Sequence, residues 1–284
     1  MSFSHPMQKI GIFYNPALFK TLDELKNKIE ILNNNKCKVF LLESQERKGL
    51  EGVSYIEDFT HKDIDLLMVF GGDGTILRAS KLVLSENIPL LGFNHGKLGF
   101  LSECEKHEFD PVLKQVINDD FRIEERTMLD CSYPNKDNHK HALNDCVLHK
   151  GKYPRMLTFK IFRNDEFLFD IESDGLIISS PTGSTAYNIS AGGSIAFPHT
   201  NVILLTAINP HNQFIKPLIL PDNDLYTIIY KKGNNKVFLI IDGEEIGQVR
   251  TGESIVVSKS NFTAKFVKLS NKSFAHILRK KFFV

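Results

Sequence analysis

The chain has 284 residues and a formal net charge of +1, with 42% hydrophobic and 24% charged residues. This length allows two domains with cores of their own, and so balanced a charge excludes the electrostatic footprint of a nucleic-acid-binding protein. The four scattered cysteines, the lack of a signal peptide and the lack of a long apolar run favour a cytoplasmic protein with reduced thiols and no membrane contact.

Up to about residue 125, apolar runs that are typical of strands alternate with helical patterns. Strands are expected at 8–14, 39–42, 64–70 and 88–93. Helices are expected after a capping box at Thr21–Glu24, from Ile76, and from Asp110–Pro111. This alternation predicts an α/β domain over residues 1–125 with a Rossmann-like parallel sheet, in which ligands bind beyond the carboxyl ends of the strands.

The segment Gly71-Gly72-Asp73-Gly74-Thr75 lies between a predicted strand and a predicted helix. Glycines let backbone N–H groups approach an anion, and a helix N-terminus adds unpaired donors, so the segment is typical of a phosphate cradle. Asp73 places a carboxylate there, which calls for a bridging Mg²⁺ or a hydroxyl to activate. The sequence matches neither a P-loop nor a dinucleotide fingerprint. An ordinary strand-to-helix turn is the alternative.

After residue 125 the pattern consists mostly of strands, which predicts a β-rich second domain over residues 126–269. Residues 156–171 read as two strands with a turn near 164–165, and residues 226–230 and 237–241 read as a second hairpin. Further strands are expected at 254–257 and 264–269. The segment 270–284, with a short basic helix, is expected to return to the first domain.

Two polar segments interrupt this second pattern. Residues 174–193 combine small hydroxyl residues with glycines after an apolar strand, which suits hydrogen bonding to a sugar or an amide; the alternative is a Ser/Gly-rich loop. Asn144 and Asp145 form a polar pair within an apolar strand that is expected at 142–148. A buried pair of this kind needs partners, which ribose hydroxyls or a structural hydrogen-bond network would supply equally well.

Taken together, these segments resemble the NAD kinase family over most of the chain. The resemblance rests on five segments in the family's order: 71–75, 94–100, 143–145, 174–193, and 209–211 followed by 216–218. The most specific of them is the run from Asp174 to Tyr187. The resemblance implies transfer of the ATP γ-phosphate to the 2′-hydroxyl of the adenosine ribose of NAD, which gives NADP. It also implies a divalent ion such as Mg²⁺ and a homo-oligomer, a tetramer or a dimer.

The resemblance also implies roles for individual residues. Asp73 would accept the hydroxyl proton and contact Mg²⁺ without a dedicated all-protein metal site. The backbone of the turn would hold phosphates, through Gly71, Gly72, Gly74 and Thr75. The positions implied for NAD binding are Asp73, Gly74, Phe100, Asn144, Asp145, Arg155, Asp174, Thr182, Thr185, Ala186, Tyr187, Ser190, Asn209, Asp242 and Glu244. Among these, Asn144 and Asp145 would hold ribose hydroxyls, and Asp174 would bind the nicotinamide carboxamide.

Three departures from the family pattern stand out. Asp145 is one methylene shorter than the Glu that the family usually has, His95 follows Asn94 in place of a smaller residue, and Glu172 stands where some relatives carry Arg. The last change leaves the preference between NAD and NADH open. Two other functions stay open as well: a lipid or sugar kinase that shares the Gly-Gly-Asp-Gly turn, and a non-catalytic regulator that binds a dinucleotide.

Overall fold

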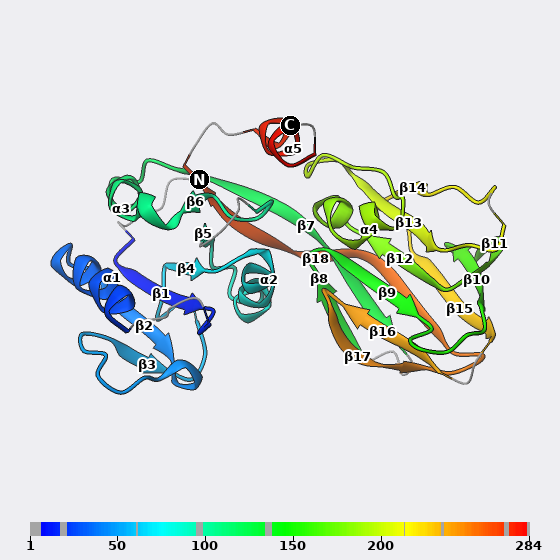
Figure 1. Cartoon of the computed structure of the whole chain (residues 1–284), viewed down its shortest axis with the longest axis horizontal. Helices are drawn as coiled ribbons and strands as arrows, with labels where there is room; N and C mark the ends of the chain where they lie inside the picture. The colour runs from blue at the N-terminus through cyan, green and yellow to red at the C-terminus, as the bar shows by residue number, and fades with distance from the viewer. Residues whose placement is uncertain are drawn as a thin grey trace. The chain divides into compact units, whose positions relative to one another are not determined.

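The structure is a computed structural model that describes residues 7–17, 22–60, 62–94, 99–133, 138–212, 214–233, 236–269 and 273–282 (Figure 1). The chain forms two compact units: unit 1 comprises residues 1–125 and 264–284, and unit 2 comprises residues 126–263. Residues 264–269, which the sequence analysis assigned to the second domain, lie in unit 1 because Phe266 pairs with Leu90 of the first sheet.

Unit 1 contains the α/β part of the fold. Its strands are β1 (Lys9–Tyr14), β2 (Lys38–Leu42), β3 (Ser54–Ile56), β4 (Leu66–Phe70), β5 (Leu90–Asn94) and β6 (Cys104–Glu105). Its helices are α1 (Leu22–Asn34), η1 (Glu43–Gln45), α2 (Asp73–Leu82), η2 (Lys106–Glu108), α3 (Phe109–Ile117) and α5 (Phe274–Phe282). Two strands, β7 (Arg122–Tyr133) and β18 (Ser254–Lys268), have one end in each unit.

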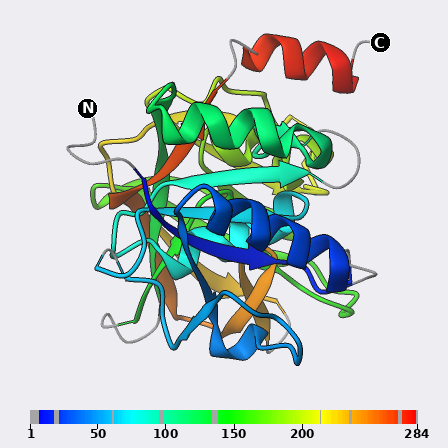
Figure 2. The same ribbon diagram turned by 90° about the vertical axis from the view of Figure 1, so that its left-hand side faces the viewer.

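The sheet of unit 1 is parallel, in the order β3-β2-β1-β4-β5. Strand β4 is buried along its whole length, as expected for a sheet with helices on both faces. Helices α1 and α3 pack into one core cluster with alternate residues of β1, β4 and β5, and Figure 2 looks onto this layer. Helix α2 covers the other face, where Ile76 lies against Gly92 of β5.

Unit 2 is β-rich. Its remaining strands are β8 (Asn138–Ala142), β9 (Asp145–His149), β10 (Leu157–Arg163), β11 (Glu166–Ser173), β12 (Gly175–Ser179), β13 (Val202–Ile208), β14 (Leu218–Pro221), β15 (Tyr226–Lys232), β16 (Val237–Ile241) and β17 (Glu244–Val249). Two short helices, η3 (Thr182–Thr185) and α4 (Tyr187–Ser190), follow β12. The α/β unit with parallel strands and the antiparallel β-rich unit confirm the predicted fold class.

The core of unit 2 lies between two layers of antiparallel strands. One layer has the order β14-β13-β12-β9-β16-β17, and in the other β10 pairs with β11 and β15, and β15 with β18. Side chains from both layers join one buried cluster, for example Phe159 and Tyr230 from one layer and Leu176 and Leu239 from the other. Alternate residues of each strand therefore face the core, as in a β-sandwich.

Two predictions about the strands of unit 2 are wrong. Strands β15 and β16 do not form a hairpin, because β15 pairs with β10 and β18 whereas β16 pairs with β9 and β17. The strands predicted at 254–257 and 264–269 are parts of the single strand β18. The hairpin at 157–173 is confirmed, and Asn164 and Asp165 form its turn with positive φ angles of 47° and 69°.

Some predicted features lie outside the described residues. They are Thr21 of the capping box, His95 with its neighbours 96–98, and residues 234–235 of the expected hairpin turn. Within the described ranges, no helix is both long and apolar enough to cross a membrane.

The contact between α2 and β5 gives a test of the packing in unit 1. A Cβ atom at Gly92 would lie 2.5 Å from Cδ1 of Ile76 and 3.2 Å from the Cα of Ser102. We expect Gly92→Ala to lower the free energy of unfolding by about 1–3 kcal/mol, the usual cost of overpacking. Thermal unfolding measures this loss of stability. Gly247→Ala is the control, because a Cβ at position 247 would meet only a side-chain carbon 3.8 Å away. Equal melting temperatures for the two variants would contradict this packing.

Candidate active site

The Gly71–Thr75 turn joins β4 to α2 in unit 1. Gly72 is the N-cap of α2, and its carbonyl accepts hydrogen bonds from the N–H groups of Thr75 (2.9 Å) and Ile76 (3.2 Å). The helix therefore begins at Asp73, three residues before the position expected from the apolar pattern. Asp73 and Gly74 thus belong to the first helical turn, where backbone N–H groups have no partner inside the helix.

The three glycines of this turn lie in different surroundings. A Cβ atom at Gly71 would collide with the side chain of Thr75, so only glycine fits there. At Gly72 and Gly74, no atom of the described residues other than the neighbouring backbone lies within 4 Å of the place that a Cβ would take. These two glycines therefore leave open space over the N-terminus of α2, which is the space that an anion would occupy.

Backbone donors from the segment after β5 hold the carboxylate of Asp73. Its Oδ2 accepts a hydrogen bond from the N–H of Phe100 (2.8 Å) and its Oδ1 accepts one from the N–H of Leu101 (3.2 Å). Gly99 must be a glycine, because a Cβ there would overlap Oδ1 of Asp73. A carboxylate oxygen has two acceptor sites, so each oxygen keeps one site for a metal ion or a hydroxyl.

The half-buried ring of Phe100 packs against helix α5. The centroid of this ring lies 6.0 Å from that of Phe274 and 5.8 Å from that of Phe282, and Nζ of Lys281 lies 4.6 Å from the centroid of Phe100. Phe100, one of the positions implied for NAD binding, thus contacts two aromatic rings and a cation from the C-terminal helix, an arrangement that the sequence analysis did not foresee.

In unit 2, residues 143–144 form a bend between β8 and β9, and Asp145 begins β9. This bend replaces the continuous strand expected over 142–148. Oδ1 and Oδ2 of Asp242 accept hydrogen bonds from the N–H groups of Leu143 (3.0 Å), Asn144 (2.7 Å) and Asp145 (3.2 Å). The carboxylate of Asp242 therefore fixes the backbone of this bend.

The segment after β12 holds the other side of the same bend. The N–H of Ser180 donates to the carbonyl of Asn144 (2.8 Å), and the hydroxyl of Ser180 donates to the carbonyl of Leu143 (2.5 Å). Gly183 lies so close to the backbone of Asn144 that a Cβ atom there would overlap its carbonyl oxygen. The structure thus brings Asn144, Asp145 and Asp242 together with Ser180 and Gly183 of the Ser/Gly-rich segment.

The side chain of Asp145 is only 5% exposed. Its carboxylate has no hydrogen-bond donor among the described residues, although a buried carboxylate normally has one. Burial, together with the negative charge of Asp242 as the smaller cause, raises the pKa of Asp145 to about 7. This carboxyl group is therefore available to a hydroxyl donor from a ligand.

Asp174 lies between β11 and β12 and is paired on both oxygens. Oδ1 accepts a hydrogen bond from Nζ of Lys150 (2.5 Å), and Oδ2 accepts one from Nδ2 of Asn209 (3.2 Å). Burial by itself would raise the pKa of Asp174, but the hydrogen bonds from Lys150 and Asn209 outweigh it and hold this pKa below its usual value. Asp174 is therefore ionised at neutral pH, next to a cation that the sequence analysis did not select.

Asn188 is a further residue that the sequence analysis did not select. It is fully buried, and its amide donates to the carbonyls of Ser184 (3.1 Å) and Ser194 (2.9 Å) and accepts from the hydroxyl of Thr206 (2.7 Å). These bonds connect the two ends of the segment around α4 to β13. Three polar contacts on one buried amide make Asn188 the internal support of this segment.

The other predicted site residues of unit 2 differ in exposure. Thr182 is buried beside Nη1 of Arg126 (3.5 Å), and the hydroxyl of Thr185 donates to the carbonyl of Thr182 (3.4 Å). Ala186 is half-buried, and five of the predicted residues are exposed: Arg155, Tyr187, Ser190, Asn209 and Glu244. Thr182, Thr185, Ala186, Tyr187 and Ser190 lie on one short run of η3 and α4, whereas Arg155 lies on the segment before β10.

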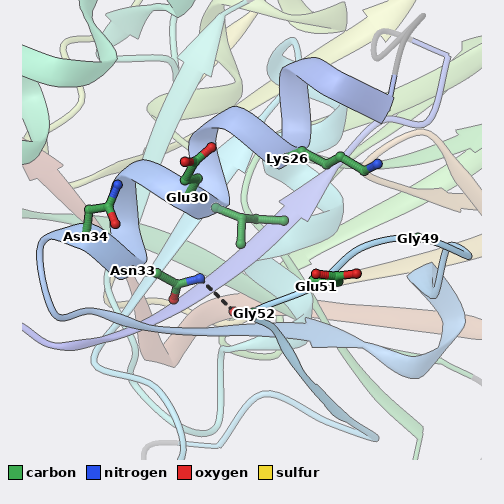
Figure 3. A pocket seen from close by; sticks show the side chains of 8 residues that line it. Lys26, Glu30, Asn33, Asn34, Gly49, Glu51 and Gly52 are labelled. Carbon is green, nitrogen blue, oxygen red and sulfur yellow. Dashed lines mark hydrogen bonds between the residues drawn. The ribbon is translucent and has the colours of Figure 1, made fainter.

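Two other features bear on ligand binding. In the part of the chain that the structure describes, no three His, Cys, Asp or Glu side chains form a group that could hold a metal ion. A surface hollow of about 400 Å³ lies on α1, where Asn33 donates a hydrogen bond to the carbonyl of Gly52 (2.9 Å) (Figure 3). None of the predicted site residues lines this hollow.

Comparisons with known proteins identify relatives of this chain. Residues 11–121 match a family model of the ATP-NAD kinase N-terminal domain, and residues 143–269 match one of the C-terminal domain. An NAD kinase of Carboxydothermus hydrogenoformans is 36% identical over 82% of this chain and 84% of its own length, and one of Moorella thermoacetica is 35% identical over 97% and 89%. A crystal structure of yeast NADH kinase complexed with NADH has a TM-score of 0.85 at 29% identity, and covers 98% of this chain and 88% of that one.

The buried carboxyl group of Asp145 gives a pH-dependent prediction. Its pKa of about 7 in the folded protein exceeds the ordinary value of 3.8, so the folded state binds more protons between these values and loses stability as pH rises from about 4 to 7. We expect Asp145→Asn, which carries no charge, to be more stable than the wild type by a few kcal/mol above pH 7 and by less at pH 5, since one pKa unit corresponds to about 1.4 kcal/mol.

Chemical unfolding at pH 5, 6, 7 and 8 measures this difference in stability. The exposed residue Asp58 provides the control, because Asp58→Asn removes the same charge from a solvated position. A constant difference between Asp145→Asn and the wild type across this pH range would show that Asp145 has an ordinary pKa in the folded protein.

Proposed function

This chain belongs to the NAD kinase family, whose members are phosphotransferases with an alcohol group as acceptor, and we propose that it transfers the γ-phosphoryl group of ATP to the 2′-hydroxyl of the adenosine ribose of NAD. The products are NADP and ADP. The observation that carries the proposal is the carboxylate of Asp73, which two backbone N–H groups hold in the first turn of α2, beside two glycines that leave open space. Phosphoryl transfer needs positioning, charge neutralisation and a proton acceptor more than covalent chemistry.

In unit 1, the Gly71–Thr75 turn binds phosphate oxygens through its backbone N–H groups. The open space at Gly72 and Gly74 supports this role, as does the dipole of α2. Asp73 accepts the proton of the ribose 2′-hydroxyl while the oxygen of that hydroxyl forms the new bond to the γ-phosphorus. The bond from the γ-phosphorus to ADP breaks, and ADP leaves. The hydrogen bonds from Phe100 and Leu101 keep the carboxylate in one orientation. Less orientational freedom is therefore lost when the reactive geometry forms.

We propose a divalent ion, such as Mg²⁺, as cofactor. Mg²⁺ is usually held by one or two carboxylates and by substrate phosphates. Asp73 fits this requirement, because each of its oxygens has one acceptor site that the backbone donors do not use. The ion would neutralise phosphate charge that Asp73 by itself repels.

In unit 2, the bend at Asn144 and Asp145 holds ribose hydroxyls of NAD. The support for this role is the buried carboxyl group of Asp145, which has no donor among the described residues and which a hydroxyl would satisfy. Asp242 contributes indirectly, since its oxygens already accept three backbone N–H groups of this bend. Thr182, Thr185 and Ser190 of unit 2 line the adenine and ribose region, and in unit 1 Phe100 borders an adenine.

The nicotinamide end of NAD binds at Asp174, with Ala186 and Tyr187 nearby. Asn209 orients Asp174 through its amide. The exposed Arg155 and Glu244 complete the dinucleotide contacts in this proposal. Because a solved relative is an NADH kinase complexed with NADH, reduced NAD is the second acceptor to test.

We further propose a cytoplasmic homo-oligomer, a dimer or a tetramer, which binds neither nucleic acid nor membranes. Unit 2 carries large exposed apolar side chains beside the edge strand β14, with Phe214 89% and Ile219 61% exposed. Exposed apolar groups next to an unpaired strand edge favour association. Light scattering of the protein as it elutes from a size-exclusion column gives the number of subunits.

The acceptor and the donor can be tested directly. We expect the purified protein, incubated with NAD, ATP and Mg²⁺, to form NADP, which an NADP-specific dehydrogenase detects. Chelation of the metal should abolish the reaction. A folded protein that binds NAD but forms no NADP with any metal or phosphoryl donor would favour the regulator function instead.

The role of Asp73 can be tested with Asp73→Asn. Asn keeps the size of the side chain but cannot take a proton or ligate metal as an anion, so we expect kcat to fall by about 10²–10⁴-fold, the usual contribution of a general base. Binding of NAD should stay within several-fold of the wild type. Initial rates and calorimetry measure both quantities.

The Mg²⁺ concentration separates the two parts of this role. If metal ligation contributes most, raising the concentration of Mg²⁺ reduces the loss in kcat; if proton transfer contributes most, it does not. A variant that keeps more than about a tenth of the wild-type kcat would contradict both, because a tenfold change corresponds to only about 1.4 kcal/mol of the activation free energy.

A further inference from the structure

Lys150 forms an ion pair with Asp174, the proposed carboxamide ligand of unit 2. Its Nζ lies 2.5 Å from Oδ1 of Asp174, and the side chains are only 17% and 18% exposed. The backbone N–H of Lys150 also donates to the carbonyl of Asp174 (3.1 Å). By contrast, the surface pair of Lys231 and Asp170 has side chains 49% and 36% exposed. The pair of Lys150 and Asp174 is therefore more shielded from water and from salt than an ordinary surface pair.

The backbone gives the ion pair a defined position. Lys150 follows β9 and Asp174 precedes β12, and Figure 1 shows these two strands side by side. The strands are antiparallel, and His149 pairs with Gly175. Asn209, at the end of β13, donates to the second oxygen of Asp174. Three adjacent strand ends thus place one ammonium, one carboxylate and one amide together.

This group of side chains matches a primary carboxamide. The carboxylate of Asp174 retains acceptor sites for an amide N–H, and an ammonium has three donors, of which Asp174 uses one. The other donors can reach a carbonyl oxygen. The ion pair is also close to neutral overall, so its field favours a positively charged ring only weakly.

On the basis of the proposed function, we propose that Lys150 is a specificity-determining residue that sets the charge preference of the nicotinamide subsite. It neutralises Asp174, so that the subsite accepts the uncharged dihydronicotinamide ring of NADH as well as the pyridinium ring of NAD. Without Lys150, Asp174 would present a bare carboxylate, which attracts the positive ring of NAD and has no comparable attraction for the neutral ring of NADH.

The test compares NAD with NADH in Lys150→Met, Lys150→Gln and Lys150→Arg. Met and Gln remove the charge, with different polarity, whereas Arg keeps it. Lys152→Met is the matched control, because Lys152 is exposed in the same turn and loses the same charge. Thermal unfolding identifies a variant that does not fold, and Gln then replaces Met as the neutral variant.

Two readouts are measured for each protein: the Kd of each dinucleotide by calorimetry, and KM and kcat for each as acceptor. We expect the neutral variants to raise the ratio of the NADH Kd to the NAD Kd by about tenfold, so that NAD is favoured. This is the size expected when one nearby charge is lost at an effective dielectric constant between those of protein and water. The ratio of KM values should follow, with kcat for NAD changed less than threefold. Lys150→Arg and Lys152→Met should keep the wild-type ratio.

A merely structural role for Lys150 would weaken the binding of both dinucleotides by the same factor, and that result would overturn the inference. An equal shift in Lys152→Met would also overturn it, since the effect would then come from general surface charge. The proposed function fails separately: in that case the wild-type protein forms no NADP or NADPH at all. A wild type that phosphorylates either acceptor, with no shift in the neutral variants, contradicts only the role of Lys150.

Discussion

The hydrogen bonds between the carboxylate of Asp242 and three consecutive backbone N–H groups are the interaction on which the candidate site of unit 2 depends. A bend between two strands leaves these N–H groups without ladder partners, and a buried unpaired N–H is costly. Asp242 meets all three at 2.7–3.2 Å. It reaches them from a tight turn with a positive φ of 50°, and its own N–H donates to the carbonyl of Asp145 (3.0 Å). The bend can then hold the half-buried side chain of Asn144 and the buried side chain of Asp145 in place without unfolding the ends of β8 and β9.

In unit 1 a carboxylate also accepts hydrogen bonds from backbone N–H groups, but its role is different. Asp73 accepts two backbone N–H groups, from Phe100 and Leu101. Both carboxylate oxygens of Asp242 accept backbone N–H groups of the bend. Asp73, in contrast, is itself the proposed functional group, and each of its oxygens can accept a further hydrogen bond. The backbone donors in unit 1 therefore act as positioning groups for the carboxylate. The glycine at position 99 is the local requirement of this arrangement, because any side chain there would displace Asp73.

Much of the fold and of the candidate site could be predicted from the sequence, because the relevant signals are local. The turn at 71–75, the hairpin at 157–173 and the polar segments each follow from neighbouring residues. The pairing of β15 does not, because an alternating strand of a sandwich looks the same whichever layer it joins, and the wrong hairpin resulted from that ambiguity. Asn188 and Lys150 were missed for a related reason. A single Asn among serines, or a Lys in a polar turn, is normally solvated, and only long-range contacts with Thr206 and Asp174 reveal their roles.

Asp145 and Asp174 of unit 2, which are both proposed to contact the dinucleotide, lie in opposite electrostatic conditions. Asp174 has a cation and an amide as partners, so its charge stabilises the fold without a ligand. Asp145 is buried, lacks a donor among the described residues and lies close to the negative Asp242, so its charge costs stability. A longer side chain, such as the Glu usual in the family, would carry the carboxylate further from the backbone. The missing methylene keeps it at the bend. Binding of ribose hydroxyls, the proposed role of Asp145, would then relieve a cost that the free protein bears, and ligand affinity would depend on pH through the titration of Asp145.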